Sequence, residues 1–392
     1  MSTDRLAGHA TNKDDLPTPA LLVDLDHFEA TLEAMAAQCR RQGCYLRPHA
    51  KTHKCPEIAR RQVAAGARGI STATVPEAEA MARAGIPGVL LTSPIVEPGK
   101  ISRMVDLARS GCEVLLAVGH LRQVELLAEA AMAAGTLVDV LVDLDVGDHR
   151  FGIEPGEPAL GLARAIDRSP SLRLRGVQAY SGLASHVRGY EARRSASLGA
   201  MSRAVETLDL LRRSGLDSAY LSGGSTGTYD IDCRLPVEVE LQCGSYIFMD
   251  VEYRAIGSRD GGAAYDDFRR SLSVLTTVVS VDREGHASVD AGVKAFATET
   301  PFRPEARDRP GLEYKYFGDE FGKVTARPGA DSPAIGDRLE FYVPHCDPTV
   351  HLYDRLYAVR GDIVEAVWDI VARREAPMTR GRRSEVVDRP WR

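Results

Sequence analysis

The segment Arg47-Pro-His-Ala-Lys-Thr-His-Lys54 holds the residues best suited to covalent chemistry. The chain has only seven lysines, and two of them, Lys51 and Lys54, lie here. A lysine amine can lose its proton and attack a carbonyl carbon, which an arginine guanidinium does not do. A lysine desolvated beside other cationic groups has a lowered pKa and can form a Schiff base. Lys51, between His49 and His53, fits this description, and the alternative is a solvated basic turn.

A second cluster, residues 143–152, follows an apolar run and places Arg150 in a loop flanked by glycines. A guanidinium fixed there could hold an anionic oxygen. The alternative is a loop arginine that pairs with Asp145 or Asp148.

A third cluster, residues 221–228, has the sequence Leu-Ser-Gly-Gly-Ser-Thr-Gly-Thr. Backbone N–H groups and hydroxyls of such a loop can turn toward a phosphate. The loop lacks a Walker lysine, which disfavours nucleoside triphosphate binding. Residues 242–246, Gln-Cys-Gly-Ser-Tyr, could close the same anion pocket, although Gly/Ser loops are often simple turns.

A fourth cluster is Pro344-His-Cys-Asp-Pro-Thr349. If the segment is a strand, His345 and Asp347 point the same way and Cys346 points away. One imidazole and one carboxylate would make a two-ligand site for a divalent metal ion, with positions left for water or substrate. The alternative is a polar turn closed by Pro348.

The elements that position these clusters alternate between short apolar runs and amphipathic helical windows, among them residues 56–65, 121–134 and 158–167. About eight such alternations predict an α/β fold with a (β/α)8 TIM-like barrel, in which functional groups lie at the carboxyl ends of the strands. An open Rossmann-type sheet is the main competitor, but no GxGxxG follows the first run. The runs are 21–25, 69–72, 89–92, 114–118, 138–143, 174–180, 219–222 and 239–242.

After about residue 253 the pattern changes to strands separated by Gly, Pro and Asp turns, which predicts a smaller, mainly antiparallel β domain. We expect the barrel to span 24–255, the β domain to span 256–378 together with 1–23, and 379–392 to form a flexible tail. The tail is basic, so a weak anionic partner is the alternative to a solvated end. The predicted strands are 271–281, 286–290, 338–343, 355–359 and 363–367.

Composition excludes several classes of protein. The formal net charge of −6 argues against general nucleic-acid binding. No apolar run approaches the roughly 20 residues that span a bilayer, and the polar residues 1–15 predict no signal peptide. The seven cysteines have no CxxC spacing, which fits free thiols in a reducing cytoplasm.

A lone lysine of the catalytic type, a basic loop and a phosphate loop on one barrel together indicate pyridoxal 5′-phosphate (PLP), which requires a Schiff-base lysine, a phosphate cradle and groups that tune its ring.

Eight stretches in order along nearly the whole chain carry a family resemblance. The chain resembles the fold-type III PLP enzymes of the D-threonine aldolase and D-serine dehydratase group, relatives of alanine racemase. The resemblance implies an N-terminal barrel, a C-terminal β domain and a homodimer with active sites near the subunit interface. The stretches begin at Thr18, Arg47, Asp145, Gln178, Gly223, Glu240, Asp290 and His345.

The resemblance also implies roles for particular residues. Lys51 would hold PLP as a Schiff base, Arg150 would reach its phenolic oxygen, and Tyr180 and Gln242 would line the cofactor pocket. His345 and Asp347 would bind a divalent metal ion such as Mn²⁺, Mg²⁺ or Zn²⁺. His186 would take a substrate proton, and His53 would tune the surroundings of Lys51 or serve the structure alone. The phosphate would lie against Gly224, Ser225, Thr226, Gly227, Gly244, Ser245 and Tyr246.

The implied reaction cleaves a D-3-hydroxy amino acid, such as D-threonine, to glycine and an aldehyde. The alternative is a dehydratase that uses the same groups to make a 2-oxo acid and ammonia. The His-x-Asp spacing at residue 345 resembles the aldolase branch, whereas the dehydratase branch has His-x-Cys. Ser71-Thr-Ala-Thr-Val75, Phe321 and Ser225 depart from the usual aldolase pattern. A racemase, a non-catalytic PLP-binding protein and a sugar-processing barrel without PLP are weaker alternatives.

Overall fold

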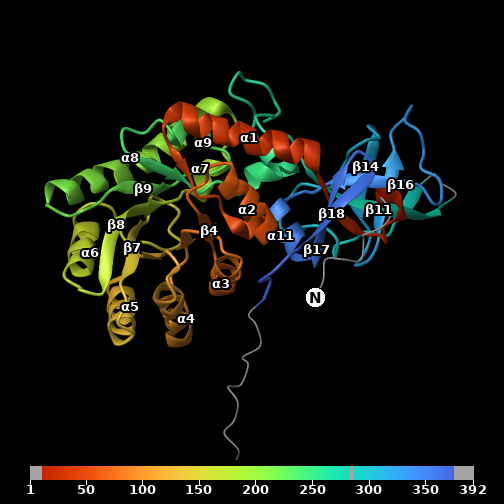
Figure 1. Cartoon of the computed structure of the whole chain (residues 1–392). Coiled ribbons are helices and arrows are strands. Elements are labelled where there is room, and N and C mark those ends of the chain that lie inside the picture. Colours follow the sequence, from red (N-terminus) through yellow and green to blue (C-terminus); the bar gives the residue numbers. More distant parts are fainter. Residues whose placement is uncertain (1–10, 283–285, 375–392) are drawn as a thin grey trace, which may run out of the picture.

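The computed structural model of the chain describes residues 11–282 and 286–374 (Figure 1). One of its sheets consists of eight parallel strands, and the His49–Ser71 bridge joins its two edge strands. There the N–H of Ser71 donates to the carbonyl of Pro48 over 2.9 Å. The sheet therefore closes into a barrel, and the predicted fold class is confirmed. In spatial order the strands are β3 (Tyr45–Leu46), β10 (Val239–Leu241), β9 (Tyr220–Gly223), β8 (Leu172–Ala179), β7 (Val138–Leu144), β6 (Val114–Val118), β5 (Val89–Leu91) and β4 (Ile70–Thr72).

Helices lie around this barrel (Figure 1). Their starts carry local signals: α2 and α4 have proline in the first helical turn, and the Thr74 hydroxyl accepts the N–H of Glu77 to cap α3. Their apolar faces pack on strands that are buried along their whole length, such as β6. The helices are α1 (Leu25–Gln42), α2 (Pro56–Ala64), α3 (Val75–Arg83), α4 (Pro98–Arg109), α5 (Leu121–Ala133), α6 (Glu157–Asp167), α7 (Gly182–Ser185), α8 (Tyr190–Arg213) and α9 (Tyr229–Asp232).

The second sheet has ten strands and is mainly antiparallel, as predicted for the smaller domain. β11 pairs with β2 and also with β16, and the second pairing closes the series β11–β12–β15–β14–β13–β16 on itself. Its strands are β1 (Thr11–Asn12), β2 (Ala20–Asp24), β11 (Leu272–Val281), β12 (His286–Val289), β13 (Glu305–Ala306), β14 (Leu312–Tyr316), β15 (Gly322–Ala326), β16 (Arg338–Tyr342), β17 (Arg355–Arg360) and β18 (Ile363–Asp369). Two short helices, α10 (Val251–Arg254) and α11 (Cys346–His351), lie beside it.

The first apolar run does not belong to the barrel, contrary to the prediction. The apolar pattern predicts residues 21–25 as a barrel strand, but residues 21–24 form part of β2, which pairs with β11 and β17 of the second sheet. The missing barrel strand is β3, only two residues long, which is too short to show a periodic pattern. The exact domain boundaries stay a prediction, and the segment 379–392 lies outside the described residues.

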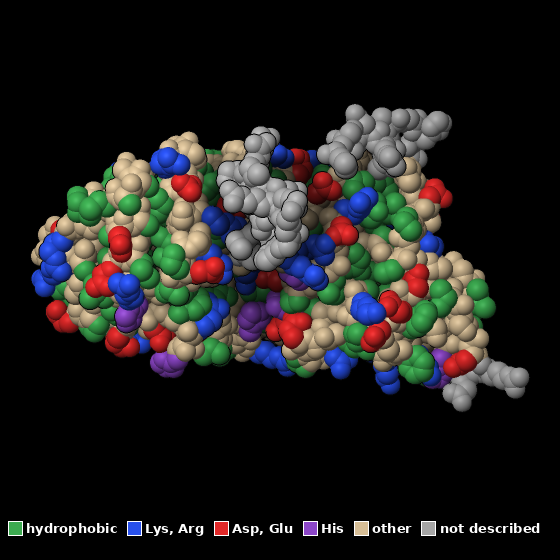
Figure 2. Space-filling model, turned by 90° about the horizontal axis from the view of Figure 1, so that it is seen from below, with side chains coloured by type: hydrophobic (Ala, Val, Ile, Leu, Met, Phe, Trp, Pro, Cys, Tyr) green, Lys and Arg blue, Asp and Glu red, His purple; other side chains and the backbone are tan. Residues whose placement is uncertain are grey.

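The surface mixes both signs of charge. On the face shown in Figure 2, lysine and arginine side chains alternate with aspartate and glutamate. Ion pairs such as Arg203 with Glu154 and Arg254 with Asp266 join neighbours of opposite sign. Within the described part of the chain, every helix is too short or too polar to cross a bilayer.

Candidate active site

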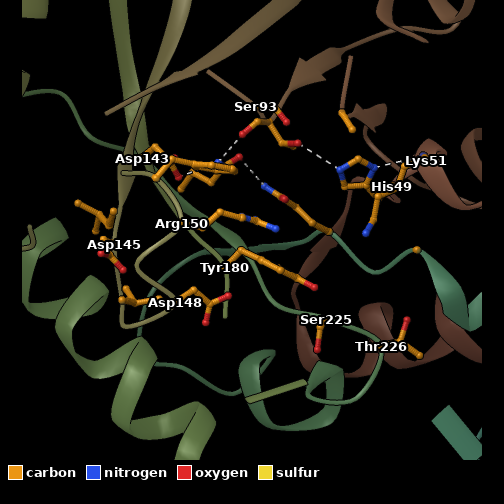
Figure 3. Close-up of a pocket in the computed structure, with 18 of the residues that line it drawn as sticks. His49, Lys51, Ser93, Asp143, Asp145, Asp148, Arg150, Tyr180, Ser225 and Thr226 are labelled. Atoms are coloured by element: carbon orange, nitrogen blue, oxygen red, sulfur yellow. Dashed lines mark hydrogen bonds between the residues drawn. The ribbon is translucent and has the colours of Figure 1, made fainter. Parts of the chain in front are cut away.

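The carboxyl ends of the barrel strands surround a pocket with an empty volume of about 880 Å³, part of which is open to solvent (Figure 3). Loops that follow β3, β7, β8, β9 and β10 contribute its walls. This is the face on which such barrels carry function. Eight predicted site residues line the pocket, namely Lys51, Arg150, Tyr180, Ser225, Thr226, Gln242, Gly244 and Ser245.

Lys51 lies in a single 3-10 turn, η3 (Ala50–Thr52), just after β3. Nδ1 of His49 accepts the backbone N–H of Lys51 over 3.3 Å and so begins the turn. Nζ of Lys51 lies 3.1 Å from Oδ2 of Asp347, which comes from α11. The charge of Asp347 raises the pKa of Lys51. Burial acts to raise the pKa of Asp347, but the charges of Lys51 and His345 outweigh it, and that pKa is lowered.

The two flanking histidines are not the cations that the sequence interpretation required. Burial lowers the pKa of His49 well below its ordinary value and the pKa of His53 to about 3, so both rings are neutral at pH 7. The expectation that cationic neighbours lower the pKa of Lys51 is therefore wrong, because the nearest charge is a carboxylate. His53 is fully buried outside the pocket lining, and its Nδ1 accepts the N–H of Cys55 over 3.0 Å. This placement favours the structural alternative for His53.

Arg150 extends into the pocket from the loop after β7 (Figure 3). Its guanidinium lies 4.3 Å from the ring centre of Phe151 and 5.6 Å from that of Tyr180. Asp145 instead accepts N–H groups of Gly147 and His149, and Asp148 accepts the Ser181 hydroxyl over 3.0 Å. The alternative in which these aspartates neutralise Arg150 is therefore not what the described residues show, and the guanidinium remains able to hold an anion.

The glycine loop after β9 is built on positions where a side chain does not fit. Gly224 has φ +73°, and a Cβ on Gly227 would lie 2.1 Å from the carbonyl oxygen of Ser185. Neither glycine lines the pocket, so both shape the loop rather than face the cavity. Ser225 and Thr226 do face it (Figure 3).

Residues 244–246 were predicted to close the anion pocket, and two of them, Gly244 and Ser245, line the cavity. A Cβ on Gly244 would lie 2.5 Å from Oγ1 of Thr52, so glycine keeps this wall open. Tyr246 corrects the prediction, because its buried hydroxyl accepts Nε2 of Gln62 over 3.1 Å and does not reach the pocket. Its contribution is the backbone N–H, which donates to Oγ1 of Thr226 over 2.9 Å and joins the two loops.

A polar network that the sequence did not reveal lies in the wall of the pocket. Nε2 of Gln178 donates to the Thr92 carbonyl (3.0 Å) and to Oδ1 of Asp143 (2.8 Å). Both partners are acceptors, so Oε1 of Gln178 is left to accept Nε2 of Gln242, at 3.1 Å. Nε2 of Gln242 also donates to the Ser222 hydroxyl over 3.0 Å. These bonds fix the orientation of the Gln242 amide in the pocket wall.

The predicted metal pair lies at the start of a helix, not on a strand. His345 precedes α11 in an extended conformation and Asp347 is in its first turn, so the strand prediction was wrong. Pro348 lies inside this helix, so the alternative of a turn closed by Pro348 is wrong as well. Nδ1 of His345 lies 2.6 Å from Oε1 of Glu299. Throughout residues 11–282 and 286–374, no three His, Cys, Asp or Glu side chains form a group that could hold a metal ion. The metal role of His345 and Asp347 stays a prediction.

His186 follows α7, and its ring centre is 4.6 Å from that of Tyr253. Tyr253 lines the pocket, whereas His186 does not. The structure therefore places His186 one aromatic ring away from the cavity.

The residues present fit PLP. The pocket contains one lysine, a guanidinium, two hydroxyl residues of a glycine loop and a wall at Gly244 that a Cβ would fill. These are the groups that a phosphorylated aldehyde cofactor requires.

Comparison with known proteins identifies the family. Residues 23–250 match the family described as "Alanine racemase, N-terminal domain", and residues 271–359 match the "Putative serine dehydratase domain". A D-threonine aldolase from an Arthrobacter species is 40% identical over 356 residues, 91% of this chain and 92% of that protein. A D-threo-3-hydroxyaspartate dehydratase from Delftia sp. HT23 is 32% identical over 79% of each chain. The crystal structure of D-threonine aldolase from Filomicrobium marinum superposes with a TM-score of 0.87 at 36% identity, covering 93% of this chain and 97% of that one.

Fold and pocket thus define a barrel enzyme of the PLP-dependent lyase class. The chain belongs to the family that joins an alanine racemase-like barrel to a serine dehydratase-type domain, the D-threonine aldolase and D-serine dehydratase group, which confirms the resemblance.

Proposed function

We propose that this protein is a PLP- and divalent-metal-dependent aldolase that cleaves D-3-hydroxy amino acids of the D-threonine type to glycine and an aldehyde. The observation that supports it most is the 3.1 Å approach of Lys51 to Asp347. It brings the lysine of the barrel and a carboxylate of the second sheet's α11 to one point at the pocket. A cofactor on Lys51 and a metal on Asp347 would then meet the same small substrate.

The chain's own residues would bind and orient the reactants. Lys51 supplies the amine that holds PLP, and Arg150 supplies a fixed positive charge beside Tyr180. Ser225, Thr226 and the open wall at Gly244 would accept the phosphate. Bound PLP supplies a sink for the electron pair released when the Cα–Cβ bond breaks.

The 3-hydroxyl must lose its proton as that bond breaks, and the Cα of the glycine product must gain one. We propose that His186, which contacts the Tyr253 ring of the pocket wall, takes the hydroxyl proton through an intervening water molecule. His345 and Asp347 would hold a divalent ion, whose Lewis acidity suits a hydroxyl oxygen.

The surroundings of His345 favour an uncharged 3-substituent. Glu299 and Glu252 lie 2.6 Å and 3.9 Å from its Nδ1, and the buried Asp250 accepts the N–H of the next residue. These carboxylates would repel the second carboxylate of 3-hydroxyaspartate and would tolerate the methyl group of threonine.

A dehydratase is the second candidate, because the Delftia relative carries that activity in its name. Incubation of the protein with D-threonine, PLP and Mn²⁺, followed by product analysis, separates the two. We expect glycine and acetaldehyde in equal amounts. Formation of 2-oxobutyrate and ammonia would replace the aldolase proposal with the dehydratase.

A further inference from the structure

Glu299 contributes a hydrogen bond to His345 in addition to its negative charge. Its Oε1 lies 2.6 Å from Nδ1 of His345, within hydrogen-bond distance. Glu252, on α10, lies 3.9 Å from the same nitrogen and is too far to hydrogen-bond. Two carboxylates thus lie near one imidazole, and one of them bonds to it.

The bond determines which ring nitrogen is free. An ionised carboxylate only accepts hydrogen bonds, so Nδ1 of His345 must carry the proton. In a neutral ring the lone pair then lies on Nε2. Histidines that bind metal ions commonly have their other nitrogen held by a carboxylate in this way.

The backbone around the pair is already fixed. The hydroxyl of Thr349, a fully buried residue, donates to the carbonyl of His345 (2.8 Å) and accepts the N–H of Ala297 (3.0 Å). One side chain therefore ties α11 to the segment that carries Glu299. The Glu299 bond then restricts rotation of the His345 ring.

We propose that Glu299 is a positioning residue, whose hydrogen bond to Nδ1 of His345 holds the ring in the tautomer and orientation that present Nε2 to a divalent metal ion. The inference rests on the proposed metal role of His345 and Asp347. The hydrogen bond, and not negative charge in general, positions the His345 ring, because Glu252 adds charge without the bond.

Metal affinity of the PLP-loaded, full-length protein tests this directly. Chelator-treated protein is titrated with Mn²⁺ by calorimetry for wild type and for Glu299→Leu, Glu299→Gln, Glu252→Gln and His345→Ala. We expect Glu299→Leu to weaken Mn²⁺ binding by roughly 10- to 100-fold. Glu299→Gln keeps an acceptor oxygen and should remain within about threefold of wild type, as should Glu252→Gln. The absorbance of bound PLP should be the same in all variants.

Unweakened binding by Glu299→Leu, together with weak binding by His345→Ala, would overturn the positioning role and leave the proposed function intact. Equal losses in Glu299→Gln and Glu299→Leu would also overturn it, because charge or direct ligation would then be the cause. Failure of wild type to bind Mn²⁺, or binding that His345→Ala does not weaken, would instead contradict the metal role in the proposed function.

Discussion

The pKa of Lys51 depends more on Asp347 than on the two histidines beside it in the sequence. Residue types and the family resemblance led to the prediction that Lys51, His345 and Asp347 carry chemistry. They could not predict the protonation of Lys51, since that depends on a carboxylate contributed by α11. Residue types also could not predict the buried hydrogen bond between Gln178 and Asp143, because it joins two separate strands.

Replacing Asp347 with asparagine should lower the pKa of Lys51. The variant loses the attraction that raises this pKa, while the desolvation that lowers it remains. Each unit of decrease gives about tenfold more neutral amine at pH values below the pKa. In metal-free protein, stopped-flow absorbance should show PLP attaching to Asp347→Asn faster at pH 7.5, with the pH–rate profile displaced to lower pH. The surface variant Asp354→Asn is the control, and an undisplaced profile in Asp347→Asn would refute the argument.

Asp143 should make the cofactor-free protein less stable as the pH rises. Burial raises its pKa from 3.8 to about 7, so the folded state retains a proton that the unfolded state has lost. Its contribution to stability is fully present below pH 3.8 and is lost at about 1.4 kcal/mol per pH unit up to about pH 7. Urea unfolding from pH 5 to 8 should show this slope in wild type and not in Asp143→Asn. Parallel curves for the two proteins would disprove it.

Between elements, most helices were predictable, whereas the short strands were not. The windows 56–65, 121–134 and 158–167 agree with α2, α5 and α6 to within one residue, because proline starts and helical periodicity are local signals. The two-residue β3 and the turn η3, which together position Lys51, carry no periodicity and depend on neighbouring strands. The glycine loops were recognisable, but burial of the Tyr246 hydroxyl was not.

The wall at Gly244 offers a test of the anion site. In Gly244→Ala the new Cβ would lie 2.5 Å from Oγ1 of Thr52 and 3.2 Å from the carbonyl of His49, so the loop must shift. We expect the dissociation constant for PLP to rise by about tenfold or more, which corresponds to at least about 1.4 kcal/mol. Gly199→Ala, on α8 with no atom within 4 Å of the added Cβ, should bind PLP like wild type. Equal affinities in the two variants would exclude Gly244 from the site.

For the whole molecule, the sequence predicted two domains and their fold classes, but it did not predict that the first apolar run belongs to the second sheet. The run at 21–25 looks like a barrel strand, because its residues are apolar throughout. It joins the other sheet, since pairing partners lie far away in the chain. The predicted homodimer and cytoplasmic location stay predictions.

Arg193 links the barrel to the segment that leads to the second sheet, although no sequence motif predicted this role. The side chain is fully buried and donates to the carbonyls of Gly227 (2.8 Å), Val187 (3.1 Å), Ile256 (2.9 Å) and Gly257 (3.0 Å). It thereby holds α8, the glycine loop and the connection to the second sheet together. Arg193→Leu would leave these carbonyls without their donor and should lower the free energy of unfolding by about 3–5 kcal/mol.

Denaturant unfolding measures this loss, with Arg194→Leu as the matched control. Arg194 is half-exposed and lies 3.8 Å from Glu191, so its replacement should change stability by no more than about 0.5 kcal/mol. Similar losses in both variants would show that Arg193 has no special structural role.

Chemical trapping tests most directly whether Lys51 is the residue that carries the cofactor. The PLP-loaded protein is reduced with borohydride, digested and analysed by mass spectrometry to find the lysine bearing the phosphopyridoxyl group. We predict the label on Lys51, at the pocket, and not on Lys54, whose amine is buried in an ion pair with Glu77. A label on Lys54 or any other lysine, or no label on a protein that remains active, would contradict the account.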